Sequence, residues 1–324
     1  MPDLGIAVWG LGTHAVKSIL PAIRICSGVS LKGVCSRDYR VLSRVASDFE
    51  CKGWRTPEEM LDDPTVDAVY LSTPIALHIA QGRLVLQADK HLWCEKPIGA
   101  SAGEVTSLLE FSRARGLTIG EGFMYLYHPQ FLQLRDILTS GRLGKIRSVS
   151  CRFGIPPLER PGFRTDPALG GGAFLDVGAY PISTVVALFP YSEPEILLAE
   201  ISGAEASPVD VEGRAVLGYG DGIRATLEWG INCAYRNEID VWGTHGSMST
   251  ERLFSKTEDH VPRFDFRDLH GNVHTEEGST GNHFTAMIGA FCGLVDDPGG
   301  AEQERVQIAR RATLAEAIRQ KSTT

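Results

Sequence analysis

"GIAVWGLGTHA", residues 5–15, places a short apolar run directly before the pattern Gly10-Leu11-Gly12-Thr13-His14-Ala15 and an amphipathic run. Gly10 permits a tight turn between strand and helix, and Gly12 lets a pyrophosphate approach the backbone at the helix N-terminus. Ala15 replaces the third glycine, which this pattern tolerates. A G-x-G-x-x-A pattern is informative only when it joins the first strand and first helix of an α/β series. The residues that follow supply this context, so we expect dinucleotide binding rather than a structural glycine turn.

The first third of the chain, from Leu4 to about Gly120, alternates short apolar runs with longer amphipathic ones. Such alternation predicts crossover units, and therefore a parallel sheet with helices on both faces. The expected strands are residues 5–10, 30–36, 66–73, 91–96 and 117–123. The expected helices are residues 13–24, 39–49, 76–89 and 101–116.

After Tyr125 the pattern changes to helices at the two ends and strands between them. The expected helices are residues 129–141, 174–189 and 302–321, and the expected strands are 145–155, 195–203, 213–220, 223–231, 236–243 and 246–254. Turn-like breaks such as "GYGDGIR", residues 218–224, indicate hairpins in a mostly antiparallel sheet. The fold class is therefore α/β, with a doubly wound Rossmann domain over residues 1–121 and an α+β domain over 122–324.

Composition excludes several classes of function. A length of 324 residues fits about two domains, and a net charge of −8 argues against nucleic acid as a partner. The N-terminus lacks a positive leader, and no apolar run reaches the roughly 18 to 20 residues that span a bilayer. We therefore expect no signal peptide and no membrane partner.

Seven cysteines without a C-x-x-C pair fit reduced thiols in a cytoplasmic protein. The histidines at 260, 270, 274 and 283 lie among Gly, Asp and Asn residues, so a surface loop is expected there rather than a metal site.

The end of the second strand bears on the choice between NAD and NADP. An acidic side chain there accepts the ribose 2′-hydroxyl of NAD, whereas NADP needs cationic and hydroxyl groups for its 2′-phosphate. Ser36 and Arg37 occupy this end, and Arg37 can also lie over the adenine. We therefore favour NADP(H); the alternative is a solvated Arg37 with Asp38 as the ribose acceptor, which would allow NAD(H).

Two further loops follow strand ends, "STP" at Ser72–Pro74 and "EKP" at Glu95–Pro97. Ligands of doubly wound sheets bind outside the carboxyl ends of the strands, so both loops are candidate contacts. Proline fixes its own φ and can hold such a loop in one shape. Lys96 is the main catalytic candidate, because an ammonium beside a substrate oxygen stabilises alkoxide character during hydride transfer.

The second domain offers Asp176 and Tyr180, four residues apart in "GGGAFLDVGAYP". This spacing puts both side chains on one face if a helix begins here. An adjacent Lys⁺ lowers the pKa of a tyrosine, so Tyr180 and Lys96 could act as proton donor and electrostatic partner. The structural alternatives are a helix N-cap for Asp176 and a packed aromatic ring for Tyr180.

The order G-x-G-x-x-A, "STP…H", "EKP", "HPQ" and "GGG…DVGAY" resembles the glucose–fructose oxidoreductase/inositol dehydrogenase (Gfo/Idh/MocA) family over nearly the whole chain. The resemblance implies a Rossmann domain, a second domain with a large open-faced sheet, and assembly as homodimers or homotetramers. It implies catalysis by Lys96, Asp176 and Tyr180. The cofactor contacts that it implies, together with those named above, are Gly10, Leu11, Gly12, Thr13, His14, Ser36, Arg37, Ser72, Thr73, Pro74, His78, Glu95, Lys96 and Arg164.

Three positions depart from the family's pattern. Tyr180 stands where many relatives carry histidine, as in the branch that includes glucose–fructose oxidoreductase and several NADP-using reductases. Ile75 follows Pro74 in place of a common asparagine, and Leu126 and Tyr127 replace a segment that often carries arginine. Contacts from that asparagine and that arginine cannot be carried over.

"HPQ", "YRNEIDVWGTHGS" and "ERLFS" look most similar to sugar 3-ketoreductases of deoxysugar pathways. In that case the loop "RPGFRTDPALGGG", residues 160–172, lines the substrate pocket. Phe163 and Arg164 would contact the substrate, with Arg164 bidentate to a diphosphate, besides Tyr127, His128 and the three catalytic candidates. The alternative for Arg164 is a loop ion pair with Asp166.

Together these observations predict an enzyme that uses NADPH to reduce a keto sugar, and the subgroup resemblance implies that the sugar is nucleotide-linked and carries its keto group at C3. The enzymatic alternative is an NADP-dependent dehydrogenase of a free sugar, a polyol or a trans-dihydrodiol. The third hypothesis is a non-catalytic NADP-sensing protein, against which the set Lys96, Asp176 and Tyr180 argues. The sequence leaves open the sugar, the hydride face, dimer against tetramer, and whether Asp176 orients Tyr180 or holds a substrate hydroxyl.

Overall fold

A computed structural model describes residues 3–159, 161–204 and 207–322, which form two compact units. The first unit contains the chain up to Phe123 together with Phe284–Ala312, and the second contains Met124–His283 and the chain from Thr313 onward. The expected division into residues 1–121 and 122–324 remains a proposal. The structure adds that residues 284–312 pack with the first unit, where Phe291 lies edge-on against Trp93 at 4.6 Å between ring centroids.

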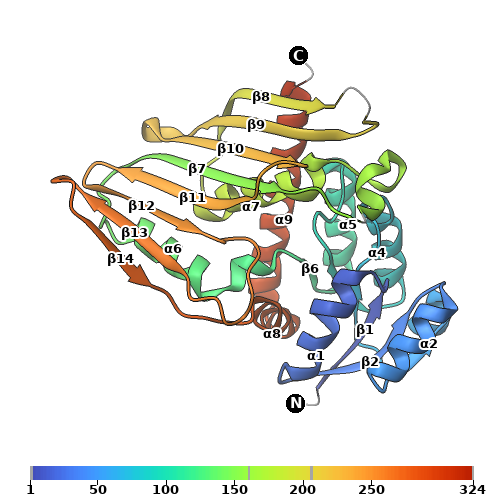
Figure 1. The fold of residues 1–324 in the computed structure, drawn as a ribbon. Helices are drawn as coiled ribbons and strands as arrows, with labels where there is room; N and C mark the ends of the chain where they lie inside the picture. Colours follow the sequence, from blue (N-terminus) through green and yellow to red (C-terminus); the bar gives the residue numbers. More distant parts are fainter. Residues whose placement is uncertain (1–2, 160, 205–206, 323–324) are drawn as a thin grey trace. The chain divides into compact units, whose positions relative to one another are not determined.

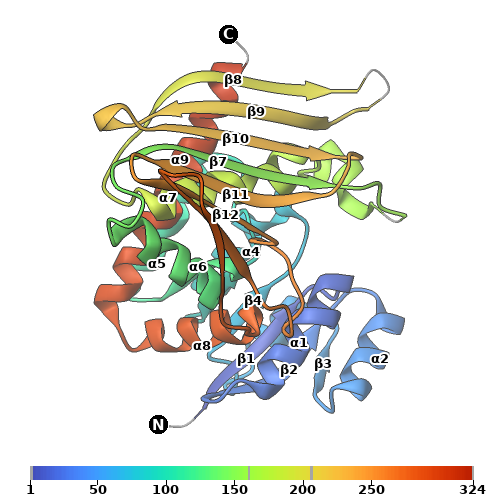
Figure 2. The same cartoon turned by 60° about the vertical axis from the view of Figure 1, so that its left-hand side comes forward.

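The first unit is built on a six-stranded parallel sheet in the order β3-β2-β1-β4-β5-β6, blue to cyan in Figures 1 and 2. This order is that of the Rossmann fold, which the alternating sequence predicted. Its strands are β1 (Leu4–Trp9), β2 (Val29–Cys35), β3 (Lys52–Trp54), β4 (Ala68–Leu71), β5 (His91–Cys94) and β6 (Ile119–Glu121). Its helices are α1 (Leu20–Ile25, after a π-helical turn at Ala15–Ile19), α2 (Tyr39–Asp48), α3 (Pro57–Leu61), α4 (His78–Gln87), α5 (Ala102–Ala114), α8 (His283–Val295) and the first part of α9 (Pro298–Ser322).

The second unit is built on an eight-stranded sheet in the order β14-β13-β12-β11-β7-β10-β9-β8 (Figure 1). All neighbours are antiparallel except β7 and β10, so the expected mostly antiparallel sheet is confirmed. Its elements are α6 (Pro129–Thr139), β7 (Ile146–Ile155), α7 (Ala179–Leu188), β8 (Glu195–Gly203), β9 (Asp210–Gly218), β10 (Arg224–Ile231), β11 (Arg236–Gly243), β12 (Gly246–Glu251), β13 (Arg263–Asp268) and β14 (Val273–Glu277).

Alternation along β7 shows how this sheet is layered. Val149, Cys151 and Phe153 are buried on the face that α7 covers, whereas Ser150 and Arg152 point to the other face and are half-buried. Successive side chains of a strand point to opposite faces, so one face of the sheet forms the core and the other is open.

The histidine-containing segment forms the expected loop only in part, because His260 lies outside any helix or strand whereas His274 lies in β14 and His283 begins α8. Residues 263–277 form the hairpin β13–β14, in which His274 stacks on Phe266 with ring centroids 5.0 Å apart. Only His270 lies in the connecting turn. The loop expectation is wrong for His274 because this strand pair is mostly polar, and its apolar alternation is limited to Phe264 and Phe266. Among the described residues no cluster of three or more His, Cys, Asp or Glu could hold a metal ion.

The described part of the chain has one helical segment, Pro167–Leu188, that is long and apolar enough to cross a membrane, and it is mostly buried in the protein. It is therefore a core segment of the second unit. All seven cysteines are free thiols, as expected, and burial raises the pKa of Cys35 and of Cys151 to about 12.

Candidate active site

The strand register brings the loops singled out in the sequence to one edge of the first unit's sheet. Trp9 pairs with Cys35 on one side and with Leu71 on the other, and Leu71 pairs with Cys94. Each of these four residues is the last of its strand. The glycine-rich turn, the Ser36 loop, the "STP" loop and the "EKP" loop therefore begin in the same row, as predicted from the parallel topology.

The turn after β1 has the two properties that a dinucleotide requires. Gly10 has φ of +100°, and a Cβ at this position would overlap the carbonyl oxygen of Ser72. Around Gly12, by contrast, no heavy atom lies within 4 Å of the position that a Cβ would take. Gly10 is thus needed for the fold, whereas Gly12 leaves open space at the N-terminal end of the first helical segment, where a pyrophosphate fits.

The three polar residues that follow β2 have different environments. Asp38 Oδ1 accepts hydrogen bonds from the backbone N–H groups of Arg40 at 3.0 Å and Val41 at 3.2 Å, so Asp38 is the N-cap of α2. Ser36 Oγ accepts from the N–H of Asp38 at 3.2 Å. Arg37 is exposed. Capping uses Oδ1 of the carboxylate that was the alternative ribose acceptor, and the exposed arginine is available for a phosphate.

His78 connects the "STP" and "EKP" loops. Its Nε2 lies 2.8 Å from the Thr73 carbonyl oxygen and its Nδ1 lies 2.9 Å from that of Pro97. The side chain is buried, and burial lowers its pKa although both carbonyls and the carboxylate of Glu95 oppose this. His78 therefore lies between the two loops, and a neutral imidazole donates a hydrogen bond to one of these two carbonyl oxygens.

The "EKP" loop leaves β5 with its glutamate held by several donors. Glu95 Oε1 accepts from the Tyr70 hydroxyl at 2.5 Å and lies 3.0 Å from His14 Nε2, and Oε2 accepts from the N–H of Lys96 at 3.3 Å. Burial, the largest effect, raises the pKa of Glu95, but the charge of His14 and the hydrogen bonds from His14 and Tyr70 lower it to about 2. The carboxylate is therefore ionised at neutral pH. The Lys96–Pro97 peptide bond is cis.

A buried ion-pair network supports the other side of this loop. The N–H of Ile98 donates to Glu121 Oε1 at 2.8 Å, and Arg311 Nε donates to Glu121 Oε2 at 2.6 Å. Arg311 also contacts Glu304 at 2.8 Å, and its side chain is only 7% exposed. The backbone around Lys96 is thus fixed by contacts from β6 and α9.

In the second unit, Arg164 pairs with Asp176 and not with Asp166. Arg164 Nε donates to Asp176 Oδ2 at 2.5 Å, and the Arg164 guanidinium lies 5.1 Å from the centre of the Phe163 ring. Asp166 instead accepts from the N–H of Ala168 and caps a short 3₁₀ turn. The alternative of an Arg164–Asp166 ion pair is therefore wrong, and the N-cap alternative for Asp176 is wrong as well, because its carboxylate is buried beside Arg164.

Tyr180 lies at the start of α7, after a π-helical turn at Phe174–Gly178 that carries Asp176. Its ring packs edge-on against Phe153 at 5.0 Å and near Phe254 at 5.3 Å, and its hydroxyl lies 3.9 Å from the sulfur of Met124. The ring is thus a packed aromatic, and only its hydroxyl is left for chemistry.

His128 and Tyr127, both expected to contact substrate, have different environments. His128 is buried and its Nδ1 accepts from the N–H of Gln130 at 2.9 Å, which caps α6. Burial, and then the charge of Lys256, lower the pKa of His128 to about 4, so the ring is neutral and can accept this bond. Tyr127 is half-buried. The capping contact gives His128 a structural role, and substrate contact by either residue remains a prediction.

Comparison with known proteins identifies the class. Residues 4–123 match the model of the oxidoreductase family with an NAD-binding Rossmann fold, and residues 131–249 match the Gfo/Idh/MocA C-terminal domain. The chain belongs to this family of oxidoreductases, as its motifs indicated.

Individual relatives cover almost the whole chain. It is 31% identical to dTDP-3,4-didehydro-2,6-dideoxy-alpha-D-glucose 3-reductase of Streptomyces violaceoruber, over 98% of this chain and 95% of the relative. It is 32% identical to the reductase of the same name from Saccharopolyspora spinosa, over 97% and 96%. The crystal structure of KijD10, a 3-ketoreductase from Actinomadura kijaniata in complex with NADP and TDP-benzene, is 29% identical and covers 98% of each chain with a TM-score of 0.94.

Sequence reasoning missed Tyr70, Glu121 and Arg311, which hold the loop around Lys96. Tyr70 and Glu121 stand inside apolar strands, where a polar group needs a buried partner. That signal was present, but the partner of each residue is distant in sequence and becomes evident only from the fold.

Proposed function

We propose that this protein reduces the 3-keto group of a nucleotide-linked deoxysugar with NADPH. The observation that carries the proposal is the row of strand ends, which gathers the open glycine turn, the Ser36–Arg37 end and the fixed Lys96 loop at one edge of a Rossmann sheet. The named reductases from two actinomycetes support the substrate class, because they match over at least 97% of this chain.

NADPH fits the residues that are present. Gly12 leaves space for the pyrophosphate, and Arg37 with Ser36 would hold the 2′-phosphate, since Asp38 is engaged as a helix cap. Arginine suits a phosphate because its planar guanidinium donates two parallel hydrogen bonds. When bound, the cofactor supplies the hydride.

The chain's own residues would supply charge and a proton. The ammonium of Lys96 would stabilise negative charge on the carbonyl oxygen as it is reduced, and the hydroxyl of Tyr180 would donate the proton. Solved KijD10 variants carry substitutions of one lysine and one tyrosine, separated in sequence as Lys96 and Tyr180 are here. Asp176, paired with Arg164, would hold a substrate hydroxyl or orient Tyr180.

A substrate diphosphate also has a candidate ligand. Arg164 is about one-third exposed, and only its Nε is used by Asp176 in the contact described above. Its terminal nitrogens could therefore meet an anionic group while the ion pair fixes the side chain.

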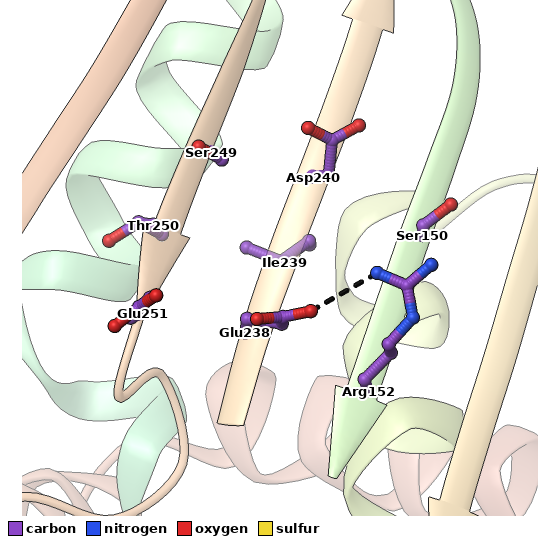
Figure 3. A pocket seen from close by; sticks show the side chains of 8 residues that line it. All are labelled: Ser150, Arg152, Glu238, Ile239, Asp240, Ser249, Thr250 and Glu251. Carbon is purple, nitrogen blue, oxygen red and sulfur yellow. Dashed lines mark hydrogen bonds and ion pairs between the residues drawn. The ribbon is translucent and has the colours of Figure 1, made fainter. Parts of the chain in front are cut away.

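We also propose that the protein is a cytoplasmic homodimer or homotetramer that uses the open face of the second unit's sheet. This face carries both signs of charge, with Arg152 between Glu228 and Glu238, and exposes Trp242. Figure 3 shows a pocket of about 270 Å³ on it, lined by Ser150, Arg152, Glu238, Ile239, Asp240, Ser249, Thr250 and Glu251. A face with both charges can be complementary to a second copy of itself about a two-fold axis.

The decisive experiment compares substrates at equal concentrations of the appropriate cofactor, NADPH for reduction and NADP⁺ for oxidation. The purified protein is assayed with a dTDP-linked 3-keto-dideoxy sugar, and separately in the oxidative direction with NADP⁺ and free xylose, glucose or a trans-dihydrodiol. The proposal expects turnover of the nucleotide sugar, and at least about tenfold lower kcat/KM, or 1.4 kcal/mol, for the free compounds. Oxidation of a free sugar or dihydrodiol without reduction of the nucleotide sugar would contradict it.

A further inference from the structure

The carboxylate of Glu95 joins three segments of the first unit. Tyr70 reaches it from β4, His14 reaches it from the glycine-rich turn, and the N–H of Lys96 reaches it from the catalytic loop. Two of the three donors share Oε1, and the third uses Oε2. A single charged group thus links the turn that receives the cofactor to the backbone of the proposed catalytic lysine.

Burial makes this link specific. The Glu95 side chain is 13% exposed and Tyr70 is 2% exposed, whereas the His14 side chain is 44% exposed. A carboxylate with so little water needs charged or polar partners. His14 is the partner from the glycine-rich turn and forms an ion pair with Glu95 when it is protonated. Its ring packs in an edge arrangement with Phe284, with ring centroids 5.4 Å apart, which limits its rotation.

His14 also stands beside the space reserved for the pyrophosphate. It is two residues after Gly12, whose surroundings are open, and it directly precedes the first helical segment, Ala15–Ile19. An imidazolium here would attract a diphosphate, and its other attachment is the carboxylate of Glu95. A bound diphosphate and Glu95 would therefore restrain the same side chain from two sides.

We propose that His14 is a positioning residue that couples NADPH binding to the placement of Lys96 through Glu95, with Tyr70 as the fixed anchor of that carboxylate. This proposal rests on the proposed NADPH-dependent reduction. It assigns to His14 an effect on the chemical step, beyond that of a cofactor ligand.

The test uses His14→Gln, which keeps a hydrogen-bond donor and removes the charge, and Glu95→Gln, which removes the opposing charge. His270→Gln, in the exposed turn between β13 and β14, is the matched control. NADPH affinity is measured by quenching of tryptophan fluorescence, since Trp9 directly precedes Gly10, and kcat is measured at saturating NADPH.

For His14→Gln we expect roughly tenfold weaker NADPH binding and a several-fold lower kcat that saturating NADPH does not restore. Glu95→Gln should give similar changes, and the double variant should be no more than about twofold worse than either single variant, because both remove the same link. The control should match the wild type.

Two outcomes would overturn the coupling. Weaker binding with unchanged kcat would make His14 a cofactor ligand only, and multiplicative effects in the double variant would show that His14 and Glu95 act independently. The binding arm needs no sugar substrate, so non-additive losses of NADPH affinity would remain informative even if the protein fails to reduce keto sugars. Failure of the proposed function is thus distinguished from failure of this inference.

Discussion

Lys96, the proposed catalytic residue, lies on a backbone segment that several neighbouring side chains hold in place. The segment from Glu95 to Ile98 is held by hydrogen bonds to Tyr70, His78 and Glu121. Because the backbone is fixed on both sides of Lys96, its ammonium is confined to the movement of its own side chain. A charged group that is already in position can stabilise the charge that develops in the transition state, and the protein does not have to rearrange during the reaction.

Substitution of Lys96 should therefore affect turnover more than binding. We expect Lys96→Ala to lower kcat by about 10²- to 10³-fold, the range for loss of one preorganised electrostatic group. NADPH affinity, followed by fluorescence, should change less than about threefold. A comparable loss in both quantities would instead indicate collapse of the loop.

Glu95 should leave a signature at acidic pH. Its folded-state pKa of about 2 is lower than the ordinary value of about 4.3, so ionised Glu95 stabilises the fold above pH 4.3. This contribution, about 3 kcal/mol, is lost as pH falls through 2. Urea unfolding of the wild type and of Glu95→Gln between pH 5 and pH 2 should show a smaller loss of stability in the variant, and parallel curves would contradict the low pKa.

At the scale of elements, the two glycines of the turn between β1 and the first helix serve different purposes, one in folding and one in cofactor binding. Gly10 and Gly12 are two residues apart in one motif, yet their surroundings are opposite. The first is enclosed by the Ser72 carbonyl and the second faces open space. The same substitution should thus have different consequences at the two positions.

We expect Gly10→Ala to lower the free energy of unfolding by at least about 1 kcal/mol, because of the positive φ and the overlap with Ser72. Gly12→Ala should leave unfolding nearly unchanged and weaken NADPH binding by about tenfold or more, because the methyl group fills space that the cofactor needs. Urea titration and fluorescence titration measure the two effects. Equal destabilisation by both variants would contradict this assignment.

The helix α9 contributes to the stability of the first unit through the buried ion pairs of Arg311. Replacing Arg311 by Met leaves the carboxylates of Glu121 and Glu304 buried without their cation, which should cost about 3 to 5 kcal/mol. Arg113→Met, which removes an exposed ion pair with Glu302, is the control and should cost less than about 1 kcal/mol. Similar costs for both variants, in urea unfolding, would argue against the buried network.

At the scale of the whole molecule, the parallel and antiparallel halves were predictable because their patterns differ. Up to residue 123 the short apolar runs of strands alternate with the longer amphipathic runs of helices. The loops that begin at Gly10, Ser72 and Glu95 follow the carboxyl ends of parallel strands, where ligands of such sheets bind. The hairpin β13–β14 was not predictable, because its strands are mostly polar. The Arg164–Asp176 pair was also missed, since Asp166 was nearer in sequence and only the folded loop shows which carboxylate is buried beside the arginine.

The proposed assembly makes a prediction at this scale. If the open sheet face joins two copies, Trp242→Asp should place a buried, uncompensated charge at the interface and shift the protein toward monomer. Light scattering after size exclusion measures the mass of the wild type and of the variant. Tyr191→Asp, at a fully exposed site outside that sheet, is the control. A monomeric wild type, or a variant of unchanged mass, would contradict the use of this face.

The inclusion of residues 284–312 in the first unit affects how the protein can be made. A ribosome releases the Rossmann strands first, whereas the segment that completes their unit, with Phe291 against Trp93 and Arg311 against Glu121, is translated only after Met124–His283 of the second unit. We therefore expect the nucleotide-binding half to complete its packing only after residues 284–312 have left the ribosome. A gene fragment that stops at residue 123 should yield an aggregating product rather than a working cofactor-binding module.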